Sequence, residues 1–126
     1  MKVRLVAIFV LTIATTCAQA ASGPLSSTVG ILHALKNYQG IVDGRIRYKD
    51  ITYEETVNAD MAFGYVLGVT DTLFYTKKIC VPPGVAEGQF LAVSVKYMDD
   101  HPDWWQYNPS LLIADALEHA FPCKHS

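Results

Sequence analysis

The sequence predicts an all-α fold, a small bundle of about four helices held by one disulfide. Apolar residues recur at steps of three and four in four segments, which is the spacing of helices with one buried face. Proline, glycine and capping residues mark the ends of these segments. A predicted export signal also leaves two cysteines, which can pair in an oxidising compartment.

The first twenty residues have the pattern of a cleaved secretory signal peptide. Lys2 and Arg4 form a basic start, residues 5–13 are an uninterrupted apolar run, and residues 18–20 end it as Ala-Gln-Ala. The run is too short for a membrane anchor, which needs about 20 apolar residues. We therefore expect cleavage after Ala20, no membrane insertion afterwards, and a single helical domain over residues 21–126.

The alternative reading of this segment is a bacterial lipoprotein acylated on Cys17. Thr16 argues against it, because that signal favours a smaller residue before the cysteine. Signal cleavage would remove Cys17 and leave Cys80 and Cys123, which predict one disulfide in an oxidising compartment. The bond would close a loop of about 43 residues and stabilise the fold by at most about 4 kcal/mol.

The charge balance argues against a nucleic-acid partner. The chain has 10 basic and 12 acidic residues, and the signal peptide contains two of the basic ones, Lys2 and Arg4. The mature chain therefore has a net charge of about −4 and no cationic stripe.

The first predicted helix begins at Ser26 or Ser27 and continues through Val29, Leu32, His33 and Lys36. We expect it to end between Asn37 and Gly40. The glycines and mixed charges of the segment from Tyr38 to Thr52 predict a loop, with a part that could be extended.

The second predicted helix begins near Tyr53, because Thr52 and Glu55 have the spacing of a capping box. Its apolar stripe is Val57, Met61, Ala62, Tyr65, Val66, Val69 and Leu73. Gly64 and Gly68 lie four residues apart, so they share one face, and each costs about 1 kcal/mol in helix propensity. We expect another helix to pack closely there, and Gly68→Leu to cost well over about 1 kcal/mol.

The third predicted helix runs from about Ala86 to Met98, after the break at residues 82–84. The β-branched residues of its centre would also suit a strand, but the apolar stripe is longer than a typical buried strand. His101 and Pro102 end it. We expect Cys80 to lie at its start.

The last predicted helix has Asn108 as its N-cap and Pro109 at its first position. Its apolar side contains Leu112, Ile113, Ala116, Leu117, Ala120 and Phe121. Pro122 and Cys123 end it, so the disulfide should clamp the third and fourth helices at one end.

Four strings resemble those of a known family in order and spacing: FGYVLGVTD (63–71), ICVPPGVAEGQ (79–89), VKYMDDHPD (95–103) and ALEHAFPC (116–123). The family is the Rap/Tai group of periplasmic immunity proteins, which protect bacteria against peptidoglycan amidase effectors delivered by type VI secretion. The resemblance covers residues 61–123. It implies an all-helical, usually dimeric inhibitor that blocks the amidase's active-site groove, without catalysis or cofactor.

An inhibitor of a groove needs a projecting segment, and the best candidate by composition is the connection from Asp99 to Asn108. It combines aspartates that could meet a basic wall with aromatic rings that could fill a pocket. Its candidate residues are Asp99, Asp100, His101, Asp103, Trp104, Trp105 and Tyr107.

The two tryptophans have two interpretations. One ring could be buried while the other lies on the surface, or they could anchor an interface, where aromatic residues are enriched. We expect alanine at the more exposed of Trp104 and Trp105 to weaken binding with little effect on the melting temperature. The other candidate surface is Tyr38 to Asp50, where Arg45 and Arg47 would suit an acidic partner.

Three other functions fit these residues less well. The acidic run with His101 could bind a metal, with His119 and His125 as weaker candidates, but consecutive residues on a helix end point in different directions. An enzyme could use His101 as base and Asp103 to orient it, but no nucleophile accompanies them at a known spacing. A small periplasmic adaptor without an amidase partner is the remaining alternative.

Overall fold

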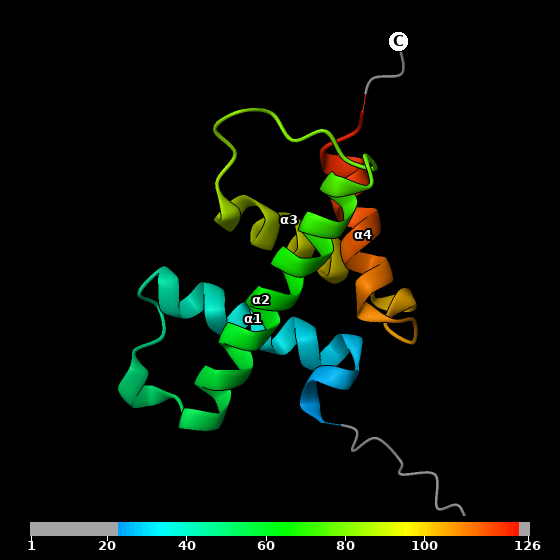
Figure 1. Cartoon of the computed structure of the whole chain (residues 1–126). Coiled ribbons are helices and arrows are strands. Elements are labelled where there is room, and N and C mark those ends of the chain that lie inside the picture. Colours follow the sequence, from blue (N-terminus) through cyan, green and yellow to red (C-terminus); the bar gives the residue numbers. More distant parts are fainter. Residues whose placement is uncertain (1–22, 124–126) are drawn as a thin grey trace, which may run out of the picture.

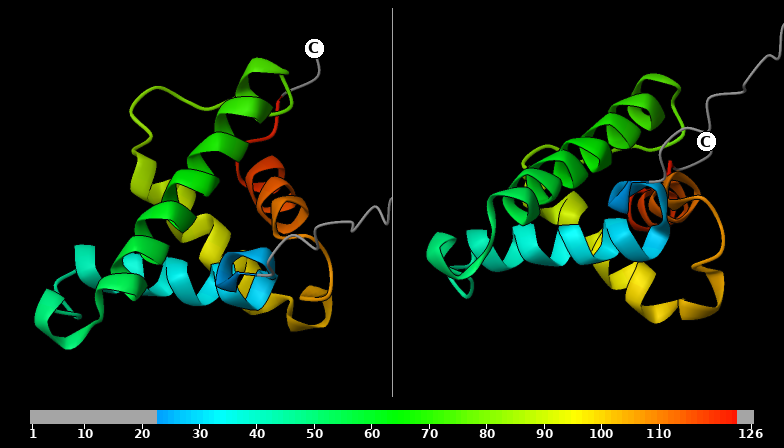
Figure 2. Two further views of the ribbon diagram at one scale, coloured as in Figure 1. Left: turned by 60° about the horizontal axis from the view of Figure 1, so that its bottom comes forward. Right: turned by 90° about the horizontal axis from the view of Figure 1, so that it is seen from below.

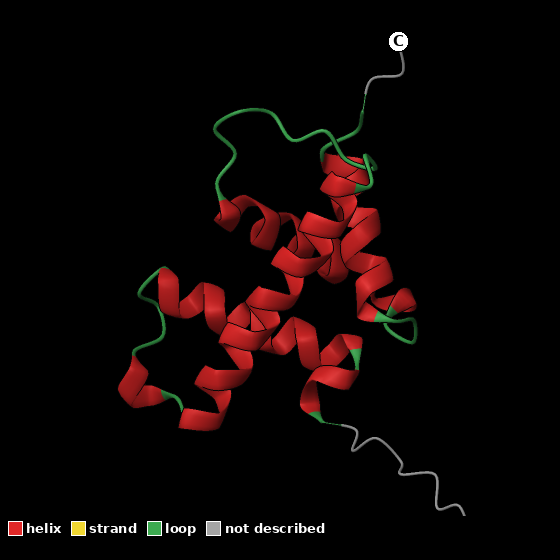
Figure 3. Ribbon diagram, viewed as in Figure 1, coloured by secondary structure: helices red, strands yellow, loops and turns green. Residues whose placement is uncertain are grey.

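The computed structural model describes residues 23–123, and this part of the chain contains four α-helices and no strand (Figure 1, Figure 3). The helices are α1 (Thr28–Val42), α2 (Tyr53–Tyr75), α3 (Glu87–Asp100) and α4 (Pro109–Ala120). Short 3-10 turns occur at Pro24–Ser26, Tyr48–Asp50 and Pro102–Trp104. The predicted all-α class is confirmed.

The core lies where the four helices meet. Each helix contributes fully buried side chains, among them Leu35 from α1, Val66 from α2, Met98 from α3 and Leu117 from α4. Helix α2 lies along one outer side of the bundle, with α1, α3 and α4 on its other side (Figure 2). No helix within residues 23–123 is long and apolar enough to span a membrane.

Helix α1 begins as predicted but ends later. The Ser27 hydroxyl accepts a hydrogen bond from the Gly30 amide at 3.1 Å, which is an N-cap. The helix continues past Gly40 to Val42, and Gly44 follows with a φ of 72°, the left-handed conformation that ends helices. The predicted end between Asn37 and Gly40 is therefore wrong, because Gly40 has a packing role inside the helix. Residues 43–52, which follow α1, contain the 3-10 turn at Tyr48–Asp50 and no β-strand.

Two glycines of α1 are the sites of close approach. A Cβ atom built on Gly30 would lie 1.5 Å from the Pro24 carbonyl oxygen, and one on Gly40 would lie 2.6 Å from Ile46 Cδ1. Gly40 also accepts a hydrogen bond from the Ile46 amide at 2.8 Å. These glycines let the flanking segments fold back onto α1.

The glycines of α2 have a different environment. Gly64 and Gly68 are exposed, and a Cβ atom on either would meet nothing within 4 Å. The predicted close helix contact is therefore wrong within one copy of the chain, which provides no packing reason for the expected cost of Gly68→Leu. Helix α2 buries the opposite face, which contains Ala59, Ala62, Val66, Thr70 and Leu73. Its capping box of Thr52 and Glu55 is present as predicted.

The Cys80–Cys123 disulfide is confirmed, but it clamps other helices than expected. Cys80 lies between the end of α2 and the start of α3 at Glu87, and its amide donates to the Phe121 carbonyl at 2.9 Å. Ile79 is buried in the core, which fixes this point of the connection close to α2. The bond therefore ties the chain beyond α2 to the chain beyond α4 (Figure 1).

The predicted positions of α3 and α4 in the chain are confirmed, but Met61 and Tyr65 of the stripe predicted for α2, and Ala120 of the side predicted for α4, are exposed. Residues 87–100 form a helix, so the strand alternative is wrong, and the Gln89 side chain accepts a hydrogen bond from the Ala86 amide. Asn108 caps α4 by accepting from the Ser110 amide at 3.0 Å. The predicted signal peptide, Cys17 and His125 lie outside the described residues.

Candidate protein-binding site

The segment from Asp99 to Asn108 connects α3 to α4 at one corner of the bundle (Figure 1). A 3-10 turn at Pro102–Trp104 compacts it. The buried Thr28 hydroxyl of α1 donates to the Tyr107 carbonyl at 2.7 Å. The connection is thus held by a third helix as well as by the two that it joins.

The tryptophans are both half-buried. Trp105 Nε1 donates to the Met98 carbonyl at 2.8 Å, and both rings pack against the core. The prediction that one ring is buried and the other lies on the surface is wrong, because the 3-10 turn lets each ring cover part of the core. Tyr107, 53% exposed, is the aromatic ring that this segment offers to solvent.

A stack of rings lies beside the segment. The His101 ring lies 4.2 Å from the Tyr97 ring and 4.8 Å from the Trp104 ring, and His119 lies 5.8 Å from Tyr97. His101 Nδ1 lies 2.8 Å from the Tyr97 carbonyl oxygen, so this nitrogen donates. Burial, with a smaller effect of Asp115, raises the pKa of Tyr97. The shift favours the neutral phenol, which is also the ordinary form of tyrosine at physiological pH.

The acidic residues of the segment point in different directions. Asp99 pairs with Lys36 of α1 at 2.6 Å, and Asp100 pairs with Lys96 at 2.6 Å. Asp103 makes no ion pair within residues 23–123 and no hydrogen bond to His101. The described residues form no metal-binding group. The metal site and the catalytic pair considered from the sequence are not formed in this part of the chain.

The segment from Tyr38 to Asp50 is less basic than its composition predicts. Arg45 pairs with Asp43 at 2.9 Å and Arg47 with Asp50 at 2.6 Å. Tyr48 is 70% exposed. This surface presents an aromatic ring with locally paired charges.

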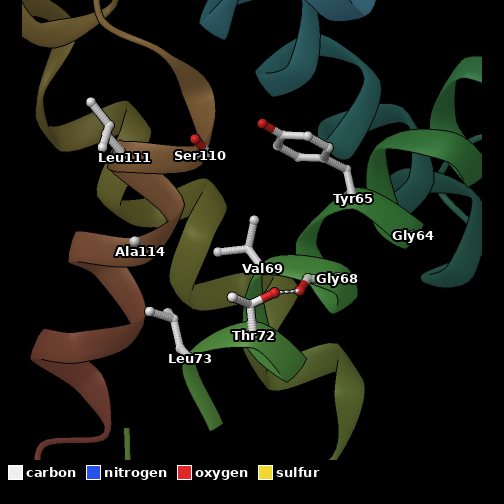
Figure 4. A pocket seen from close by; sticks show the side chains of 9 residues that line it. All are labelled: Gly64, Tyr65, Gly68, Val69, Thr72, Leu73, Ser110, Leu111 and Ala114. Atoms are coloured by element: carbon white, nitrogen blue, oxygen red, sulfur yellow. Dashed lines mark hydrogen bonds between the residues drawn. The ribbon is translucent and has the colours of Figure 1, made fainter. Parts of the chain in front are cut away.

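An apolar groove that the sequence pattern does not predict lies between α2 and α4 (Figure 4). It has a volume of about 650 Å³, with Gly68 and Val69 on the α2 side and Leu111 and Ala114 on the α4 side. A second hollow of about 300 Å³ between Trp104 and α4 shares Leu111 with it. Leu111 is the residue from which the groove could have been predicted. It is a large apolar residue outside the apolar side predicted for its helix, which indicates an exposed apolar surface.

The fold is that of a small, disulfide-clamped helical domain with exposed aromatic and apolar patches, which are the residue types enriched at protein interfaces. A family model of Rap1a immunity proteins matches residues 15–123. The chain therefore belongs to the Rap1a immunity protein family, and membership implies that it binds a partner effector protein. The comparisons with curated proteins and with solved structures found no match.

Proposed function

We propose that the chain is an exported, periplasmic immunity protein that inhibits a type VI secretion peptidoglycan amidase. In this proposal the segment from Asp99 to Asn108 enters the amidase's substrate groove and blocks it. The protein acts as a homodimer and needs neither a catalytic step nor a cofactor. Family membership and the four motif strings support the class of partner.

We choose the segment from Asp99 to Asn108 as the binding segment because it exposes the Tyr107 ring and is held in place by hydrogen bonds to α1 and α3. The Thr28 hydroxyl holds the Tyr107 carbonyl, and Trp105 holds the end of α3. A connection that is already ordered loses little conformational entropy on binding. Asp103, which has no ion-pair partner among the described residues, can meet a basic groove wall and steer association.

The test compares two exposed tyrosines on the two candidate surfaces. Tyr107→Ala should weaken binding to a candidate amidase effector by about 2 kcal/mol, or about 30-fold, as expected of an interface anchor. Tyr48→Ala is the matched control and should bind normally. Isothermal titration calorimetry measures the affinity, and protection from lysis on periplasmic expression of the amidase measures inhibition.

Two results would contradict the proposal. If Tyr48→Ala or changes at Arg45 and Arg47 abolish binding while Tyr107→Ala does not, the earlier segment is the binding site. If the native chain neither binds nor protects, it is an adaptor or binds another class of effector. Trp105→Ala is a poor probe, because losing its hydrogen bond and core contacts should lower the melting temperature.

A further inference from the structure

The groove between α2 and α4 adjoins the segment that we propose to enter the effector. Leu111 lines the groove and is 57% exposed. It also lines the hollow beside Trp104 and Tyr107. The groove and the segment from Asp99 to Asn108 therefore form one continuous surface, and a protein that covers Tyr107 can extend into the groove.

The shape of the groove favours a helix as its occupant. It follows α2 from Gly64 to Leu73, a span of about 14 Å at the helical rise of about 1.5 Å per residue. Val69 points from α2 into the space between the two helices (Figure 4), and the bare backbone at Gly68 lets another chain approach closely. An amphipathic helix of two to three turns fits such a groove through its apolar side.

Other forms of peptide fit this site less well. Residues 23–123 contain no strand, so this part of the chain has no sheet edge to which an extended segment could add. Proline-rich segments bind grooves lined with aromatic rings, whereas Tyr65 is the only ring among the described residues that line this groove.

Acidic residues border the groove and the adjoining hollow. Asp71 is exposed on α2, three residues after Gly68, and Asp115 of α4 lines the hollow. Neither carboxylate forms an ion pair with the described part of the chain, and neither does Asp103 of the neighbouring connection. Lysine or arginine side chains of a partner would complement this negative rim.

The exposed lysines that follow α2 do not neutralise this rim. Lys77 and Lys78 line a separate hollow together with Glu118, which is the carboxylate that they offset. Within residues 23–123 neither lysine forms an ion pair with Asp71 or Asp115.

We propose that the groove between α2 and α4 binds a cationic amphipathic helix of the effector. The apolar side of that helix lies against Val69 and Leu111, and its lysine or arginine side chains lie toward Asp71 and Asp115. The inference rests on the proposed function, because the helix belongs to the same effector that receives the segment from Asp99 to Asn108. Complementary charges contribute specificity, so the groove helps to select which effector is bound.

The first test changes the apolar contact. Leu111→Gln should raise the dissociation constant for a candidate amidase effector at least about tenfold, because a polar side chain replaces an apolar one in the groove. The exposed site should tolerate the change without unfolding. Val42→Gln, at a helical residue that is 67% exposed on α1, is the matched control and should bind normally. Isothermal titration calorimetry measures the affinity, and sedimentation velocity measures the oligomeric state of each variant alone.

The second test changes the charge of the rim. Asp71→Asn combined with Asp115→Asn should lower the association rate constant about fivefold in about 50 mM salt, and by less in about 500 mM salt, which screens the attraction. The control, Glu54→Gln combined with Glu87→Gln, removes the same charge from exposed helix starts outside the groove and should keep the native rate. Surface plasmon resonance measures both rates.

The third test needs no effector. A stapled helical peptide of about 14 residues, with a leucine ridge flanked by lysines, should shift the NMR amide signals of Gly64, Gly68 and Ala114 in the mature protein. The same peptide with glutamates in place of the lysines should leave these signals unshifted.

Three results would overturn the inference: native affinity in Leu111→Gln, a native association rate in the neutral pair, or no shift with the lysine peptide. A changed oligomeric state of Leu111→Gln alone would place a second copy in the groove, and the inference would again be wrong. If Tyr107→Ala weakens binding while Leu111→Gln does not, the proposed function stands and this inference fails. If the native chain binds no effector but the lysine peptide binds in the groove, the proposed function fails while the chemistry of the groove is supported.

Discussion

Removing the disulfide should lower the free energy of unfolding by about 3–4 kcal/mol. The change is the double variant Cys80→Ala and Cys123→Ala, which leaves no free thiol from this pair. The bond spans 43 residues, and the loss of unfolded-chain entropy on closing such a loop is worth about 4 kcal/mol at 25 °C. That is a large part of the 5–15 kcal/mol typical of small proteins.

The native geometry suggests that most of this loss acts through the unfolded chain. The backbone hydrogen bond from Cys80 to Phe121 and the burial of Ile79 do not depend on the sulfur atoms. The native state of the variant should therefore keep its structure, while its unfolded state expands. Since the denaturant slope follows the surface exposed on unfolding, the slope should increase.

Urea unfolding of the mature protein, followed by far-ultraviolet circular dichroism, measures both quantities. The native protein in reducing agent is the control and should match the double variant. Alkylation without reductant, followed by mass spectrometry, should label no thiol in periplasmic material. A loss below about 1 kcal/mol with an unchanged slope would refute the account based on chain entropy.

Three further predictions concern stability. Gly30→Ala should lower the free energy of unfolding by at least about 2 kcal/mol in urea unfolding, because its Cβ would overlap the Pro24 carbonyl and the backbone would have to shift; an unchanged value would contradict that packing. Ser94→Ala should raise the melting temperature, since the buried Ser94 hydroxyl has no partner and its burial costs about 1–3 kcal/mol; a decrease would indicate an unseen partner. Hydrogen bonds from the Thr52 backbone and side chain lower the pKa of Glu55 from 4.5, so its contribution is present above pH 4.5 and is lost as pH falls through its lower native pKa. The native protein should lose more stability than Glu55→Gln on acidification below pH 4.5, and parallel losses would argue against this cap.

The helices could be predicted because their signals are local. Asn108 with Pro109, and Thr52 with Glu55, mark helix starts through groups only a few residues apart. The end of α1 was misjudged because Gly40 reads as a stop signal. Only its contact with Ile46 shows why glycine is needed inside the helix.

The surfaces were harder to predict because they depend on which side of a helix faces the core. The spacing of Gly64 and Gly68 identifies a bare face but does not say whether that face is covered. Met61 and Tyr65 were assigned to the buried stripe, yet both are exposed in the structure. The alanines on the opposite face provide the same small volume, and sequence spacing alone does not choose between the two.

The half-buried tryptophan pair also has a practical consequence. Trp104 and Trp105 are the chain's two tryptophans, so its intrinsic indole fluorescence comes entirely from the connection between α3 and α4. The His101 ring lies tilted with its centroid 4.8 Å from that of the Trp104 ring, so the indole is in direct contact with a neighbouring side chain of the same connection. If the effector docks on this connection, as proposed, binding should change the fluorescence without an attached dye. The same signal, followed in a stopped-flow instrument, would then measure the rate of association with the effector.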